Sequence, residues 1–194
     1  MGRILTTEML RESFGHLARI NPKVYRDMQP YFRIQTYQKG EIIRERDVEE
    51  SYVHYVHTGT MAQLYPAKRG RDYRVRIFTE GSVAADLYAY FEKGPSPFYL
   101  RAISYVSCFS LKNDAEAALL HEMPEISRLS TFVNRQLLEE THKYLRCFQL
   151  PLRQGFAFFW ENYREERKFL SRKDLAFLFN TSSASIKKLM DNLP

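Results

Sequence analysis

The sequence has few cysteines, which limits the kinds of site it can build. Only Cys108 and Cys147 are present, far apart in the chain. Neither belongs to a Cys-x-x-Cys pair, so the spacing gives little support to a disulfide framework, a zinc site or a cysteine-ligated iron–sulfur cluster. We expect both to be buried free thiols.

Long apolar runs are missing as well. No stretch approaches the ~20 apolar residues that span a membrane, and no signal-peptide core follows Met1. We therefore expect a cytoplasmic protein with no membrane partner.

Signatures of catalysis and of metal binding are also absent. No nucleophile–base pair, glycine-rich phosphate loop or carboxylate pair stands out, so the sequence does not predict an enzyme. His54 and His57 lie on opposite faces if their segment is a strand. No histidine pair has ligand spacing, and we expect no metal and no cofactor.

What is present is the composition of a folded, basic protein. The 194 residues are 44% hydrophobic and 14% aromatic, with a formal net charge of +6. This is enough apolar material for a sizeable core and argues against disorder. The positive charge suits a polyanionic partner without requiring one.

The first two thirds of the chain change from helical to alternating periodicity. Residues 5–32 predict one or two short helices, broken at Asn21-Pro22. From Tyr31 to Leu111, short alternating segments such as Tyr73–Ile77 are bounded by turn residues about every 8–12 positions. Seven or eight antiparallel strands, in a sandwich or barrel, are therefore expected.

A long helix is predicted next. Pro124 opens it, and no glycine or proline follows until Pro151. About 25 residues at ~1.5 Å each give a rod nearly 40 Å long. The stripe fits a coiled-coil seam between two chains, and the alternative is a helix lying on its own barrel. The apolar positions of the stripe are Ile126, Leu129, Val133, Leu137, Tyr144 and Phe148, with Thr141 as a polar gap.

The C-terminal stretch predicts two short helices joined by a tight turn, after a first helix near Phe156–Tyr163. Ser171 and Asp174 form a capping-box pattern, and Asn180 suits a left-handed turn. Ser182 caps a second helix with the apolar stripe Ile186, Leu189, Met190 and Leu193. Ala176 lies four residues before Asn180 and Ile186 six after it, the offsets of a helix-turn-helix. An ordinary αα-hairpin is the alternative.

This order of elements resembles the Crp/Fnr family of transcription regulators. Lys39-Gly40-Glu41-Ile42-Ile43 is similar to the family's Lys-Gly-Glu-x-(Ile/Leu) strand opening. Gly59 and Gly81 look like the glycines after the central strand and before the nucleotide-binding cassette. The resemblance, with the periodicity above, implies an α+β chain. Its parts are an N-terminal antiparallel, jelly-roll-like β-barrel of cyclic-nucleotide-binding type (1–123), a dimerisation helix (124–150) and a helix-turn-helix unit (151–194).

The resemblance also implies a homodimer paired through the long helix that reads a double-stranded DNA operator, with a small-molecule effector in the barrel. The implied DNA-binding residues are Arg172, Lys173, Ser182, Ser183, Ala184, Lys187 and Lys188. Ser183 and Ala184 stand where many members carry an Arg and a Glu that read bases, so a different base preference is expected. A sensor or protein-interaction dimer without specific DNA binding is the alternative.

The nucleotide pocket departs from the family pattern. The implied ligand-binding residues are Asp86, Leu87, Ser96, Phe98 and Tyr99. Ser96 stands where the family's phosphate-pairing arginine belongs, so a bound phosphate lacks its charge-assisted partner. Weak or no binding of cyclic AMP is expected. The run Lys68-Arg69-Gly70-Arg71 is basic enough for nucleic acid, but a predicted hairpin turn makes a solvated loop the alternative we favour.

Overall fold

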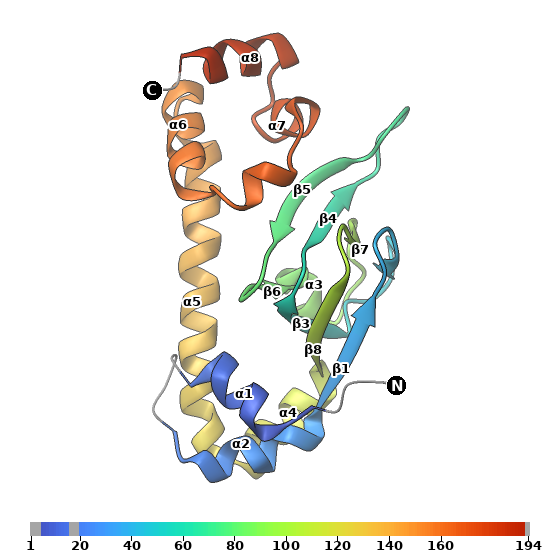
Figure 1. Ribbon diagram of the computed structural model, residues 1–194, viewed down its shortest axis with the longest axis vertical. Coiled ribbons are helices and arrows are strands. Elements are labelled where there is room, and N and C mark those ends of the chain that lie inside the picture. The colour runs from blue at the N-terminus through green and yellow to red at the C-terminus, as the bar shows by residue number, and fades with distance from the viewer. Residues whose placement is uncertain (1–4, 16–19, 193–194) are drawn as a thin grey trace.

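The computed structural model describes residues 5–15 and 20–192, so the predicted apolar position Leu193 lies outside it. Figure 1 shows the long helix α5 (Pro124–Gln149) running along one side of the molecule. N-terminal helices lie at one end of α5, C-terminal helices at the other, and the strands beside it. In the part of the chain that the structure describes, no helix combines the length and apolar character needed to cross a membrane.

Within the described residues, eight strands form two four-stranded sheets in which every pair is antiparallel. The sheet orders are β1-β8-β3-β6 and β2-β7-β4-β5. The strands are β1 (Phe32–Tyr37), β2 (Ile42–Arg44), β3 (Tyr52–Thr58), β4 (Met61–Tyr65), β5 (Tyr73–Phe78), β6 (Val83–Ala84), β7 (Tyr99–Ala102) and β8 (Val106–Lys112). The predicted antiparallel β-unit is thus confirmed, and its alternating apolar side chains fill the space between the sheets. That core contains Val56, Met61, Phe78, Ala84, Leu100, Ala102, Val106 and Cys108.

The remaining helices pack around this unit and along α5. They are α1 (Thr7–Phe14), α2 (Pro22–Met28), α3 (Leu87–Glu92), α4 (Asn113–Glu122), α6 (Leu152–Asn162), α7 (Arg172–Leu178) and α8 (Ser183–Asp191), with 3-10 turns η1 (Gln29–Tyr31) and η2 (Glu166–Phe169). As predicted, α2 begins at Pro22 after the cap Asn21, and α5 ends before Pro151, which cannot continue it, whereas α1 already ends at Phe14. Both cysteines are buried free thiols, as expected.

Two glycines sit where backbones approach too closely for any side chain. Gly59, at φ 91°, would place a Cβ 2.0 Å from the Tyr105 carbonyl oxygen. Gly155 would place one 1.9 Å from the Cys147 carbonyl oxygen, so α6 can pack on α5 only without a side chain there.

The apolar stripe predicted on α5 faces the chain's own core, which corrects its assignment to a seam between two chains. Ile126 and Leu129 are buried with α1, α2 and Phe109. Tyr144 and Phe148 pack with the C-terminal helices. The alternative considered from sequence, a helix lying on its own barrel, is right that these residues pack within their own chain, but their neighbours are mainly the helices at each end of α5. A different set is exposed on α5, namely Phe132, Leu138 and Leu145.

Candidate DNA-binding and effector-binding sites

The C-terminal unit forms the predicted helix-turn-helix geometry. The Ser171 hydroxyl accepts a hydrogen bond from the Asp174 backbone N–H at 3.3 Å, and the Asp174 carboxylate accepts one from the Ser171 N–H at 2.8 Å. Asn180 adopts φ 46°, and the Thr181 N–H donates to the Ala176 carbonyl at 2.9 Å to close the turn. Ile186 is fully buried against α7. The offsets read from the sequence therefore produce two helices that pack across a left-handed turn.

The predicted DNA-binding residues divide into an exposed set and one engaged side chain. Arg172, Ser182, Ser183, Ala184, Lys187 and Lys188 are exposed. The Ser182 hydroxyl accepts from the Ser185 N–H at 3.0 Å and caps α8. Lys173 differs, because its ammonium donates to the Arg71 carbonyl at 2.6 Å and lies 4.7 Å from the Tyr73 ring centre.

Three of the five predicted ligand-binding residues share one cavity. A hollow of about 560 Å³ lies between the barrel and α5, and Asp86, Leu87 and Phe98 line it. Leu138 and Thr141 of α5 and Arg76 of β5 complete its wall. Tyr99 does not reach this cavity, because its side chain is buried and its hydroxyl donates to the Asp72 carboxylate.

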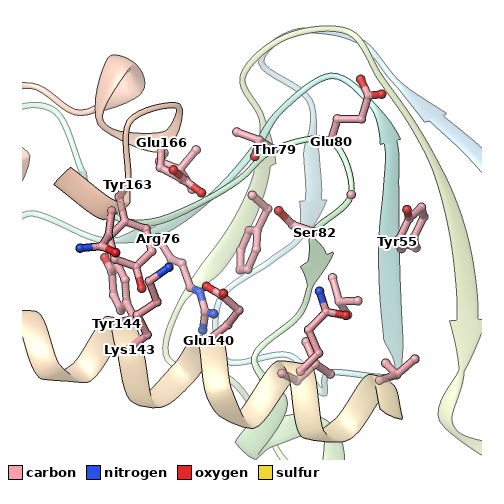
Figure 2. Close-up of a pocket in the computed structure, with 18 of the residues that line it drawn as sticks. Tyr55, Arg76, Thr79, Glu80, Ser82, Glu140, Lys143, Tyr144, Tyr163 and Glu166 are labelled. Atoms are coloured by element: carbon pink, nitrogen blue, oxygen red, sulfur yellow. The ribbon is translucent and has the colours of Figure 1, made fainter. Parts of the chain in front are cut away.

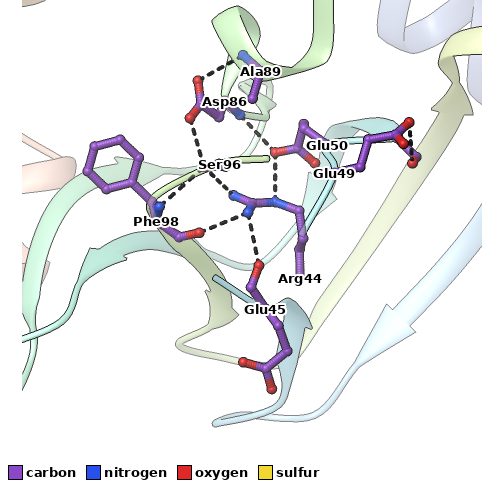
Figure 3. Close-up of polar contacts among 9 residues, drawn as sticks. Arg44, Glu45, Glu49, Glu50, Asp86, Ala89, Ser96 and Phe98 are labelled. Atoms are coloured by element: carbon purple, nitrogen blue, oxygen red, sulfur yellow. Dashed lines mark hydrogen bonds and ion pairs between the residues drawn. The ribbon is translucent and has the colours of Figure 1, made fainter. Parts of the chain in front are cut away.

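Ser96 does not line this cavity and belongs to a network of hydrogen bonds with Arg44, Asp86 and Phe98 (Figure 3). Its hydroxyl donates to the Asp86 carboxylate at 2.7 Å and accepts from Arg44 at 3.1 Å, and the side chain is fully buried. The hydroxyl therefore has no free donor for a ligand phosphate. Asp86 in turn caps α3, because its other carboxylate oxygen accepts from the Ala89 N–H at 3.4 Å.

Arg44 is the centre of that network, and no pattern in the sequence marked it. Its guanidinium donates to the Glu50 carboxylate at 2.9 Å and to the Phe98 carbonyl at 2.8 Å. Burial raises the pKa of Glu50, while the Asp86 N–H and Arg44 oppose that shift. The positive charge of buried Arg44 is thus balanced by the Glu50 carboxylate within the protein.

A second cavity lies at the junction of the barrel with α5 and α6 (Figure 2). It holds about 370 Å³ and is lined by charged and aromatic side chains, among them Arg76, Glu140, Lys143, Tyr163 and Glu166. Burial raises the pKa of Glu166. Arg76 borders both cavities, and its guanidinium lies 5.4 Å from the ring centres of Phe78 and Tyr144. Arg76 lies on β5, Glu140 and Lys143 on α5, and Glu166 in η2, so the sequence does not predict that these three elements meet.

Solved structures identify the fold as that of Crp/Fnr-type regulators and cyclic-nucleotide-binding domains. CLP of Xanthomonas campestris, described as a c-di-GMP responsive global regulator, matches with TM-score 0.62 and 14% identity over 88% of this chain and 90% of that one. FixK2 of Bradyrhizobium japonicum matches with TM-score 0.59 and 20% identity over 84% of each chain. A cyclic-nucleotide-binding domain from Methylobacillus flagellatus matches with TM-score 0.61 and 14% identity over 70% of this chain and 78% of that one.

At these identities the likeness establishes the fold alone. No protein-family model matches the sequence, and no curated protein matches it. The chain thus has the Crp/Fnr regulator fold.

Proposed function

We propose that this chain is a dimeric, DNA-binding transcription regulator with a sensor barrel (1–123), a dimerisation helix (124–150) and a DNA-binding unit (151–194). The observation that carries the proposal is the exposed face of α8, the recognition helix. Ser183, Ala184, Lys187 and Lys188 project from it, while Ile186 is buried beneath. None of the ion pairs among the described residues involves either lysine. Both ammonium groups are therefore free for phosphate, and the small side chains admit a close approach to base edges.

Dimerisation is proposed through the face of α5 that its own chain leaves open. Leu138 and Leu145 are 58% and 47% exposed and lie seven residues apart, which is the heptad spacing of a coiled-coil seam. Pairing two copies here would place two recognition helices for two half-sites about 34 Å apart on DNA.

The effector of this regulator is proposed to be something other than a cyclic nucleotide. The Ser96 hydroxyl is already hydrogen-bonded to Arg44 and Asp86, so Ser96 offers no anchor for a cyclic phosphate. Both cavities border α5, so a small molecule in either one can change how two copies of α5 pair. Such a change would shift the population of DNA-binding geometries.

The test is DNA affinity after removal of the two recognition-helix lysines. Fragments that the wild-type protein retains from sheared genomic DNA serve as probes at ~0.15 M salt. Lys187→Ala with Lys188→Ala is expected to weaken binding by on the order of tenfold and to lower its salt dependence. The matched control is Lys23→Ala with Arg26→Ala, two exposed cations on α2 at the opposite end of the molecule (Figure 1). Equal affinity in the two double variants would overturn the proposal and favour a sensor or interaction dimer without specific DNA binding.

A further inference from the structure

The loop joining β4 and β5, residues 66–72, is a basic element that plays no part in the helix-turn-helix itself. We call it the hairpin tip. Lys68 and Arg69 are exposed there, and neither takes part in an ion pair within the described chain. Gly70 next to them has φ 79°, the left-handed conformation that makes the turn. The two free cations therefore project from a tightly turned loop.

The hairpin tip is fastened to the first helix of the helix-turn-helix. Arg71 donates to the Ser171 hydroxyl at 2.7 Å and to the Asp174 carboxylate at 2.6 Å. Lys173 donates back to the Arg71 carbonyl at 2.6 Å. The Arg74 backbone N–H donates to the second Asp174 oxygen at 3.0 Å. Hydrogen bonds donated in both directions therefore hold the hairpin tip against the N-terminal turn of α7.

Aromatic stacking extends this contact toward the recognition helix. The Phe177 ring of α7 stacks on Tyr73 with centres 4.1 Å apart and planes 11° apart, and on Tyr65 at 5.6 Å and 23°. A hollow of about 370 Å³ is lined by Tyr73 of the hairpin together with Ser183 in the first turn of α8. The hairpin therefore lies beside the start of the recognition helix, and Figure 1 shows it reaching the end of the molecule that carries α7 and α8.

We propose that the hairpin tip is a second phosphate-binding element, through which Lys68 and Arg69 contact the backbone of the double-stranded DNA bound by the helix-turn-helix. The inference rests on the proposed function. In a helix-turn-helix the first helix crosses the DNA backbone, and the tip is bonded to the N-terminal turn of that helix. Because the tip is already held in place, little ordering entropy is lost when its cations meet phosphates.

The composition of the tip favours a polyanion over a lipid surface. Among the described residues, none of the large exposed apolar side chains falls within 66–72. A loop that inserts into a membrane interface needs such side chains beside its cations. Lys68 and Arg69 are exposed, and so is Arg172 in the turn of α7 to which the tip is hydrogen-bonded, so all three cations are accessible to phosphates.

The test compares three double variants of the full chain on the same genomic fragments, and on a random duplex, at several salt concentrations. Lys68→Ala with Arg69→Ala is expected to weaken binding about tenfold on both DNAs. The slope of log K against log salt should fall by about 0.9 for each phosphate that the variant no longer neutralises. Lys23→Ala with Arg26→Ala is the control of equal charge, and thermal melting shows that each variant is folded.

The outcomes distinguish failure of the hairpin contact from failure of the proposed DNA-binding function. If the Lys187→Ala, Lys188→Ala protein loses affinity while the hairpin variant keeps the wild-type affinity and slope, the hairpin contact is wrong and the DNA-binding unit stands. If neither double variant differs from the α2 control, both fail. Weakening in both recognition-helix and hairpin variants, with a smaller salt slope in each, supports the contact.

Discussion

The buried carboxylate of Asp174 accepts a hydrogen bond from Arg71 at 2.6 Å, across 103 residues of sequence. The Asp174 side chain is fully buried, whereas Arg71 is half exposed. Burial alone would raise the pKa of Asp174, but hydrogen bonds from Arg74 and Ser171 and the charge of Arg71 together hold that pKa below its usual value. This contact joins the β-unit to the helix-turn-helix, so the position of α8 depends on it.

Removing Arg71 should loosen that junction. Arg71→Ala is expected to lower the free energy of unfolding by about 1–2 kcal/mol, because a buried carboxylate loses a charge-assisted partner that is itself partly solvated. Urea unfolding followed by the fluorescence of Trp160 measures the change. Arg69→Ala, two residues away and exposed, should stay within about 0.5 kcal/mol of wild type. Equal effects would mean that Arg71 acts only as a surface charge.

Substitution in the buried Arg44–Glu50 pair should lower the free energy of unfolding far more than substitution in an exposed ion pair. Arg44→Met leaves the Glu50 carboxylate buried without its cation and is expected to cost about 3–5 kcal/mol. Adding Glu50→Gln removes the uncompensated charge and should recover part of that loss. Urea midpoints of the single and double variants decide the matter. A double variant less stable than Arg44→Met would contradict the role of the uncompensated charge.

The helix-turn-helix can be predicted from short-range sequence spacing, whereas its contact with the β-unit cannot. The cap at Ser171, the left-handed Asn180 and the small Ala176 each act within a few residues, so spacing alone predicts them. Strand alternation likewise predicts the β-unit, because one face of each strand is buried. By contrast, Arg44 is hydrogen-bonded to Ser96, 52 residues away, and the hydrophobic pattern does not predict such long-range polar pairs. The sequence also does not predict what covers the apolar stripe of α5. A helix packed on its own chain and a helix packed on a second copy need the same three-four spacing of apolar residues.

Buried His54 should make stability fall in mild acid. Its ring nitrogen lies 2.7 Å from the Ser110 hydroxyl. Burial, followed by the nearby charge of Arg44, lowers its pKa from 6.5 to about 4. Between these values the unfolded chain binds a proton that the folded chain refuses, so this contribution is full above pH 6.5 and is lost as the pH falls toward 4. The loss at pH 5 relative to pH 7 is about 2 kcal/mol.

The measurement is urea unfolding at pH 7 and pH 5. His54→Gln, whatever its own cost, should reduce the stability difference between the two pH values by about 2 kcal/mol. His121→Gln, an exposed histidine on α4, should leave that difference unchanged. A His54→Gln protein with the wild-type pH dependence would show that His54 is already protonated at pH 5.

If two copies pair through Leu138 and Leu145 of α5, charged side chains at these positions should leave the protein monomeric. Leu138→Glu with Leu145→Glu places two carboxylates from each copy against each other, so sedimentation should show the mass of one chain. Tyr105→Glu changes an equally exposed apolar residue on the β7–β8 turn and should leave the mass unaltered. A double variant that sediments like wild type, with both as dimers, would place the interface elsewhere.

The most direct test of the central claim is selection of bound fragments from sheared genomic DNA at ~0.15 M salt, with purified wild-type protein and no added nucleotide. A dimeric regulator should enrich one near-palindromic motif with half-sites about one helical turn apart. Because the Ser96 network is closed, cyclic AMP should leave that enrichment unchanged. Enrichment of the motif only when cyclic AMP is present would contradict the closed network. Salt-sensitive binding with no enriched motif under either condition would mean either that the unidentified effector is required or that the chain lacks specific DNA recognition.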